Sequence, residues 1–181
     1  MFSKFTLFTT LTVSLLLPTQ AQEKENDISS ELQILSDGVG TWDCAITVWP
    51  AGLDADPLTM KGVETNEAFG KHWISSGFTS EFQGQKVKVH TLVGYDLDLK
   101  KFVGTVIDHG PYAAKMKGKF DKETKTIHWT TQAKTPDGQP MIQKTSVTHK
   151  SATERHLIMK MKNPANGKFT KFMEITYTKR K

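Results

Sequence analysis

Hydrophobic and polar positions follow two different periods along this chain. Between residues 27 and 39, apolar side chains recur at three- and four-residue spacings, as Ile28, Leu32, Leu35 and Val39. This spacing predicts a short amphipathic helix. From residue 41 the period falls to two and stays there to the C-terminus, which is typical of β-strands with one buried face.

The period-two region divides into ten segments, separated by turns rich in Asp, Asn, Gly and Pro. No second helix and no change of composition divides residues 22–181. The pattern therefore predicts an all-β domain, a single antiparallel up-and-down barrel of about eight to ten strands with a short N-terminal helix. We expect strands near 41–49, 59–69, 72–82, 86–95, 101–109, 112–120, 126–133, 140–149, 156–162 and 168–178.

A barrel of this size can enclose a ligand or be filled by its own side chains. The predicted inward faces are rich in aromatic residues and in methionine, whose flexible thioether suits either a variable apolar pocket or an irregular core. The candidate lumen residues for ligand binding are Trp42, Ile46, Glu64, Asn66, Phe78, Tyr112, Met116, Trp129, Met159, Met173 and Tyr177.

Two of these candidates are polar and allow two interpretations. Glu64 and Asn66 share a strand face with Met60 and Ala68. They either belong to a solvated face or lie inside the lumen, where they would orient a ligand or hold ordered water.

The first predicted strand carries a motif that resembles a known signature. Gly40 and Trp42 follow the helix and resemble the Gly-x-Trp motif of lipocalins and other calycin barrels. In those proteins the Trp closes one end of the barrel, and a basic side chain from the last strand packs over it. The resemblance implies that Lys179 or Arg180 has this role here, as a cation–π contact.

A longer series of short motifs supports a more specific resemblance. In order, they are Gly94-Tyr95-Asp96, Phe102-Val103-Gly104-Thr105, Asp108, Gly118, Asp121 and the run from Met173 to Lys179. In their order and spacing they resemble a bacterial family described as domain of unknown function 1579. The chain departs from that family at Val106, where the family tends to place Trp, and at Lys179, which precedes Arg180. The resemblance implies a calycin-like barrel and no particular activity.

The first 21 residues have the pattern of a signal peptide. Lys4 precedes an apolar and hydroxylated segment at 5–17, and Thr19 and Ala21 place small residues at a cleavage site. The segment is shorter than the ~20 apolar residues that a spanning helix needs, although a membrane anchor is the alternative. We expect cleavage, a periplasmic or secreted domain at 22–181, and no stable membrane insertion afterwards.

Charge and cysteine content narrow the possible partners. The formal net charge is +5 at pH 7 and +4 without Lys4. Lysines alternate along 115–119 without interleaved aromatic residues, so we interpret them as a solvated face and predict no nucleic-acid partner. Cys44, the single cysteine, alternates with apolar residues and is expected to be a buried, unreactive thiol.

Histidines are the main candidates for cofactor chemistry. A hairpin should set His149 and His156 across from each other, but two imidazoles do not complete a zinc site. One calycin branch binds haem through a single histidine, so His90, His109 or His128 would be the haem ligand in that alternative. We otherwise expect no cofactor and no metal.

The sequence contains no nucleophile elbow, phosphate-binding glycine loop or His-Glu-x-x-His pair, and predicts no enzymatic activity. The favoured interpretation is an exported barrel that binds a small apolar or amphipathic molecule in its lumen. The alternative is a filled barrel that serves as a structural or protein-interaction module, followed by a haem- or metal-binding barrel or an enzyme. The oligomeric state has no signal in the sequence.

Overall fold

The structure is a computed structural model that describes residues 28–163 and 166–181. The predicted signal peptide lies outside the described residues. The described chain begins with one helix, α2, and continues with ten strands. Their bounds are α2 Ser29–Asp37, β1 Gly40–Val48, β2 Leu58–Phe69, β3 Trp73–Phe82, β4 Gln85–Asp96, β5 Lys101–Ile107, β6 Ala114–Asp121, β7 Thr126–Lys134, β8 Pro140–Ser151, β9 Glu154–Lys162 and β10 Phe169–Lys179.

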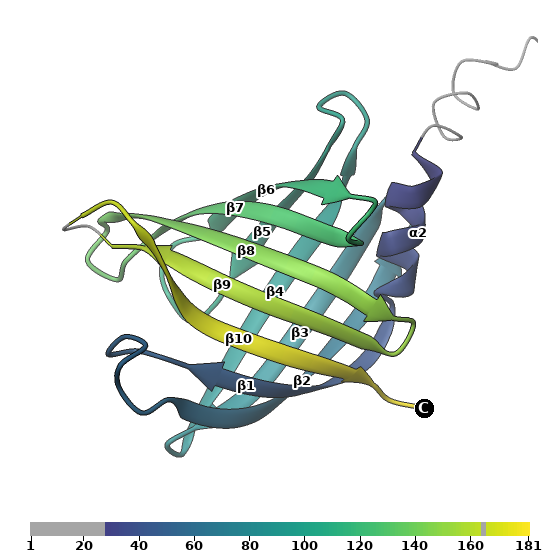
Figure 1. Cartoon of the computed structure of the whole chain (residues 1–181). Coiled ribbons are helices and arrows are strands. Elements are labelled where there is room, and N and C mark those ends of the chain that lie inside the picture. The colour runs from purple at the N-terminus through teal and green to yellow at the C-terminus, as the bar shows by residue number, and fades with distance from the viewer. Residues whose placement is uncertain (1–27, 164–165) are drawn as a thin grey trace, which may run out of the picture.

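The ten strands form one closed antiparallel barrel in which each strand pairs with its neighbours in sequence (Figure 1). Closure is made by β1 and β10, with Trp42 opposite Lys179 and Val48 opposite Met173. Pairing of the first and last strands leaves no free sheet edge, which in an open sheet would favour aggregation. The predicted all-β up-and-down barrel with a short N-terminal helix is confirmed.

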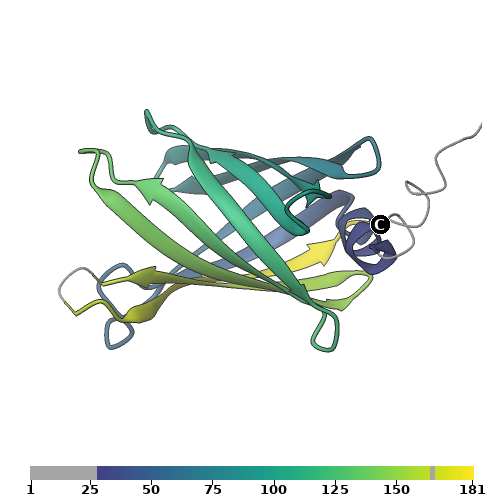
Figure 2. The same cartoon turned by 90° about the horizontal axis from the view of Figure 1, so that it is seen from above.

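Helix α2 lies across one end of the barrel, close to the C-terminus of the chain (Figures 1 and 2). Its residues Ile34 and Leu35 are buried against the ends of β4, β5 and β7. Phe102, which is fully buried, meets Tyr95 and Trp129 edge to face, with ring centroids 5.2 and 6.0 Å away. Such edge-to-face pairs are the preferred aromatic geometry. These contacts close this end of the barrel.

A second core cluster continues along β1 and β10. It contains Trp42, Cys44, Ile46, Ile175 and Tyr177, all on the inward face that the period of two defines. The two clusters together occupy the half of the barrel next to α2, which we call the closed half.

Glycines allow the large rings of the interior to lie against the wall. A Cβ on Gly118 would come within 2.8 Å of a Trp129 ring atom, and one on Gly62 within 2.7 Å of the Phe78 ring. Both distances are too short for real carbon atoms, so the absence of a side chain at these two positions lets the rings pack. Gly40 has φ 121°, a conformation that glycine adopts without steric cost.

The half of the barrel away from α2, the open half, is packed much less tightly. Every buried residue of the strands lies in the closed half or at mid-barrel, whereas the strand ends that point away from α2 contain none. Within the described part of the chain, no helix is long and apolar enough to cross a membrane.

Candidate ligand site in the barrel

The strand register decides which predicted site residues face the interior. Antiparallel partners point to the same side of the sheet, and Trp42, Glu64 and Phe78 are consecutive partners across β1, β2 and β3. The same reasoning places ten of the eleven candidates inside. The inward candidates are Trp42, Ile46, Glu64, Asn66, Phe78, Met116, Trp129, Met159, Met173 and Tyr177.

Tyr112 is the exception. The strand that was expected to include it begins only at Ala114, so Tyr112 lies in the loop before β6. Its ring is 40% exposed, lies beneath the Lys134 ammonium at 5.0 Å, and its hydroxyl approaches Gly138 of the β7–β8 turn. Tyr112 therefore packs at the rim of the open half and not in the lumen.

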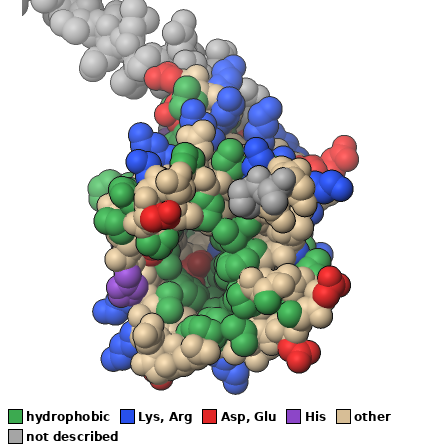
Figure 3. Space-filling model, turned by 90° about the vertical axis from the view of Figure 1, so that its left-hand side faces the viewer, with side chains coloured by type: hydrophobic (Ala, Val, Ile, Leu, Met, Phe, Trp, Pro, Cys, Tyr) green, Lys and Arg blue, Asp and Glu red, His purple; other side chains and the backbone are tan. Residues whose placement is uncertain are grey.

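The open half encloses a hollow that opens away from α2. Figure 3 shows this opening, surrounded by hydrophobic side chains and with an acidic side chain visible inside. Inward side chains beside this space, such as Met159 and Met161, are only half-buried. The closed half is thus filled by side chains, whereas the open half is hollow.

Methionine dominates the inward surface. All six methionines after the N-terminal one occupy inward positions in the strand register, and they come from five different strands. Unbranched thioether side chains change shape at low cost, so a wall of this kind can accommodate apolar molecules of different outline. The six are Met60, Met116, Met141, Met159, Met161 and Met173.

A polar network lies where the two halves meet. Glu64 Oε1 accepts hydrogen bonds from Arg155 Nη2 at 2.9 Å and from Asn66 Nδ2 at 2.8 Å. Asn66 Nδ2 and Trp42 Nε1 each donate to the carbonyl of Gly38, at the C-terminal end of α2, at 2.9 Å. The network therefore joins the floor of the hollow to the helix. Of the two interpretations of Glu64 and Asn66, the interior position is correct.

Arg155 on β9 is the cation that packs over Trp42. Its guanidinium lies 3.9 Å from the Trp42 ring centroid and 4.6 Å from that of Tyr177, and its side chain is 9% exposed. Lys179 makes a longer contact with Trp42 at 5.2 Å, whereas Arg180 turns outward to Asp43. The expectation of Lys179 or Arg180 is thus half correct, and the main partner is Arg155.

Cations also suit this position because a helix ends here. The carbonyl groups at the C-terminus of α2 carry partial negative charge. Lys179 Nζ lies 3.5 Å from the carbonyl oxygen of Asp37, and Arg155 Nη1 approaches Gly38. The helix is therefore attached to the barrel by hydrogen bonds and charge as well as by its apolar face.

The predicted pairing of His149 with His156 is wrong. A register shift between His149 and Ser151, next to the β8–β9 turn, makes His149 pair with Arg155 and His156 with Thr148. His149 is consequently inward and buried, whereas His156 is on the outer face. Burial, and secondarily the charge of Arg155, lowers the pKa of His149 to about 4, so its imidazole is neutral at pH 7.

Two further inward groups are held in their neutral forms. Burial raises the pKa of the Cys44 thiol to about 12, and the nearby Glu64 carboxylate adds to this. Burial likewise raises the pKa of the Tyr177 hydroxyl well above its ordinary value. Because the thiolate is the reactive form of cysteine, Cys44 is unreactive here, as the sequence predicts.

The three histidines considered as haem ligands do not reach the lumen. His90 and His128 are on outward positions of β4 and β7, and His109 lies after β5, where its Nε2 accepts from the Lys88 amide at 3.0 Å. Among the described residues, no group of three or more His, Cys, Asp or Glu side chains is placed to hold a metal ion.

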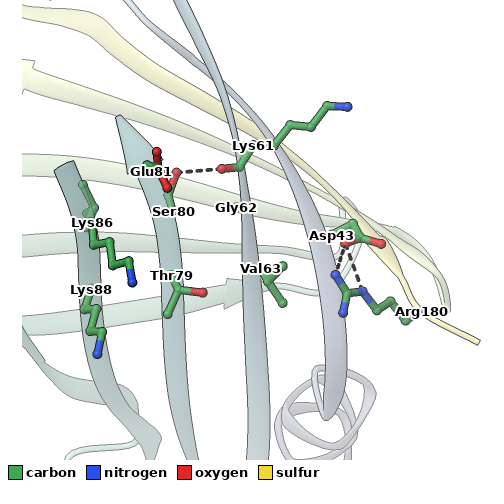
Figure 4. A pocket seen from close by; sticks show the side chains of 11 residues that line it. Asp43, Lys61, Gly62, Val63, Thr79, Ser80, Glu81, Lys86, Lys88 and Arg180 are labelled. Carbon is green, nitrogen blue, oxygen red and sulfur yellow. Dashed lines mark hydrogen bonds and ion pairs between the residues drawn. The ribbon is translucent and has the colours of Figure 1, made fainter. Parts of the chain in front are cut away.

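A second concave surface lies outside the barrel, over β1 to β4 (Figure 4). This outer groove has a volume of about 580 Å³. Arg180 donates to Asp43 Oδ1 from Nε at 3.0 Å and from Nη2 at 2.6 Å, which closes one end of the groove. Its remaining charged side chains are Lys61, Glu81, Lys86 and Lys88.

The fold defines the protein as a calycin-like barrel, and comparison with known proteins agrees. The chain belongs to the family described as "Protein of unknown function (DUF1579)", whose family model matches residues 28–179. No curated protein sequence matches the chain.

Solved structures with little sequence similarity share the fold. Rv2717c from M. tuberculosis is 10% identical with a TM-score of 0.63, and the match covers 83% of this chain and 97% of that one. The S-type phycobiliprotein lyase CPES from Guillardia theta is 9% identical with a TM-score of 0.56, covering 82% and 92%. At these identities the similarity establishes the architecture alone.

Proposed function

We propose that this protein is an exported, non-enzymatic carrier that binds a small apolar or amphipathic molecule in the open half of its barrel. The observation behind the proposal is the hollow itself, which is open at the end that Figure 3 shows and is closed at the other end by α2 (Figure 1). Sites for small molecules are typically concave and mostly apolar, with a few polar groups that converge on the ligand. Here the methionine-rich wall supplies the apolar surface, and the Glu64 network supplies the polar groups.

The energetics require both parts of the site. Burial of ten methylene groups contributes about 8 kcal/mol at ~0.8 kcal/mol each. Association costs at least about 4 kcal/mol, which leaves a dissociation constant of about 1 mM from apolar contact alone. Tight binding therefore needs a polar group of the ligand to meet the network at the floor of the hollow.

Displacement of a neutral fluorescent dye tests the proposal. We expect Nile red to bind the mature protein with enhanced emission and to be displaced by medium-chain amphiphiles. The variant Met159→Trp places a larger side chain in the hollow and should weaken dye binding at least tenfold. Lys160→Trp, the next residue on β9 and outward-facing, is the matched control and should bind the dye normally.

If the wild type binds neither the dye nor any amphiphile, or if Met159→Trp and Lys160→Trp behave alike, the lumen is not a binding site. Native mass spectrometry of protein purified from the exported fraction supplies an independent observation. A polypeptide mass that begins near Gln22 would support export. An additional mass that is lost on denaturation would reveal a carried molecule.

The outer groove supports a second candidate function, the binding of an acidic protein partner. No ion pair is formed by Lys61, Lys86 or Lys88 among the described residues, so these lysines can meet anionic side chains. Under this candidate, replacement of all three by Gln would abolish recovery of a partner from the exported fraction. Met159→Trp would leave that recovery unchanged.

A further inference from the structure

We infer that the lumen selects amphiphiles whose polar group is an uncharged hydrogen-bond donor, such as a hydroxyl, and discriminates against carboxylates and other anions. This inference rests on the proposed function and specifies the class of ligand. It follows from the charges that face the hollow and from the partners those charges already have.

Glu64 is the single carboxylate on the inward positions of the described strands. Its side chain is 16% exposed, and it lies where the hollow meets the closed half. An ionised carboxylate only accepts hydrogen bonds, so a ligand group that contacts Glu64 must donate one.

No inward cation of the open half balances an anionic ligand. In the described strands, each lysine of the open half is on the outward face, as Lys61, Lys88 and Lys160 illustrate. The other inward polar side chains of this region are neutral hydroxyls and amides, those of Ser76, Ser80, Gln85, Thr91, Thr131, Gln143, Thr145 and Thr170. A buried anion without a paired cation is strongly disfavoured.

Arg155 does not serve as that cation, because its contacts are already made. Its Nη2 donates to Glu64, and its planar group is enclosed between the rings of Trp42 and Tyr177. Its Nε has no hydrogen-bond partner but is inaccessible to solvent. A ligand in the hollow would have to displace an aromatic ring to reach it.

Two ligands of equal chain length test the inference directly. We expect 1-decanol to displace Nile red from the wild-type protein at pH 7.5 at least tenfold more effectively than decanoate. Equal or tighter binding of decanoate would overturn the inference and leave the carrier function intact. If neither compound nor the dye binds, the carrier function itself fails.

A variant adds an independent readout. Glu64→Gln keeps the size of the side chain but removes the negative charge and leaves Arg155 positive, so decanoate should bind at least tenfold more tightly than to the wild type. The matched control is Glu174→Gln, which alters an outward glutamate paired with Lys171 at 3.0 Å and should leave both affinities unchanged. An unaltered preference in a folded Glu64→Gln protein would overturn the assignment to Glu64, and if that variant does not fold, the wild-type comparison decides.

Discussion

Arg155 shows how a single side chain joins the two halves of the barrel. Its charge is paired with Glu64, its faces are covered by Trp42 and Tyr177, and its outer nitrogen approaches the end of α2. A buried ion pair adds little net stability compared with apolar packing, but removal of one partner leaves the other charge buried and unpaired. The cost of losing Arg155 should therefore be large.

We predict that Arg155→Met lowers the free energy of unfolding by about 3–5 kcal/mol, because Glu64 is left as an unpaired buried charge. Urea denaturation at pH 7, followed by circular dichroism, measures this change. Arg180→Met is the control, since the Arg180–Asp43 pair lies on the exposed surface, where such pairs contribute little. Similar midpoints for Arg155→Met and the wild type would show that the network is not a source of stability.

His149 should make the stability of the fold depend on pH. Its folded pKa of about 4 lies below the ordinary value of 6.5, so the unfolded chain binds the proton first as the pH falls. Its contribution is complete above pH 6.5 and is lost as the pH falls towards 4, by roughly 3 kcal/mol in all. Urea midpoints between pH 7.5 and 4 measure this loss.

The comparison of variants isolates the contribution of His149 from that of the acidic residues. In His149→Gln, the acid-induced loss between pH 6.5 and 4 should be smaller than in the wild type. His156→Gln, which alters the outward histidine of the same hairpin, should keep the wild-type dependence. Identical pH profiles for all three proteins would mean that His149 is accessible to solvent when the protein is folded.

At the scale of elements, α2 is the part of the fold whose removal should have the widest effect. It is short, lacks a side-chain cap at its N-terminus, and would be only marginally stable in isolation. Its stability comes from Ile34 and Leu35, which are buried against the aromatic cluster, and from the bonds that its Gly38 carbonyl accepts.

We predict that Leu35→Ala lowers the free energy of unfolding by about 2–5 kcal/mol, the range for a buried leucine reduced to alanine. Gln33→Ala, on the exposed side of the same helix, should change it by no more than about 0.5 kcal/mol. Thermal and urea unfolding of the two variants supply the comparison. A small effect at Leu35 would mean that the barrel closes without α2.

The number and order of the elements could be predicted from the sequence, because the change of period near residue 40 and the recurrent turns are local signals. Which residues of two neighbouring strands lie opposite each other is not decided by such local signals. The register of β8 against β9 shifts between His149 and Ser151, and this shift pairs His149 with Arg155 in place of His156. One extra residue in a strand changes which residues oppose each other, and the hydrophobic period gives no sign of it in advance.

The candidate site was predictable to a similar degree. Alternation within strands correctly identifies the inward methionines and rings, but it does not decide whether polar residues such as Glu64 and Asn66 face solvent or the interior. Arg155 alternates with Leu157 and Met159, and that signal would have placed it inside. The predicted strands at 140–149 and 156–162 instead leave Arg155 in the loop between them. The prediction that Tyr112 lines the lumen is wrong because its strand begins two residues later, at Ala114.

At the scale of the whole molecule, the barrel combines a packed half and a hollow half on the same strands. Both core clusters, the aromatic contacts and the polar network lie in the half next to α2. The other half keeps its backbone hydrogen bonds but has few buried side chains behind them. Local opening is easiest where few buried apolar contacts oppose it, so the stability of the backbone should fall along each strand away from α2.

Hydrogen exchange followed by mass spectrometry tests this gradient. We predict the slowest exchange in segments of the closed half, such as 42–45, 126–129 and 175–177, and faster exchange at 140–143 and 160–162 on strands of the same barrel. A ligand that occupies the lumen should slow exchange selectively in the second group, because it supplies the buried contacts that this half lacks. Uniform protection along the strands, or slowing confined to the outer groove at 86–88, would contradict a lumen whose open half is completed by its ligand.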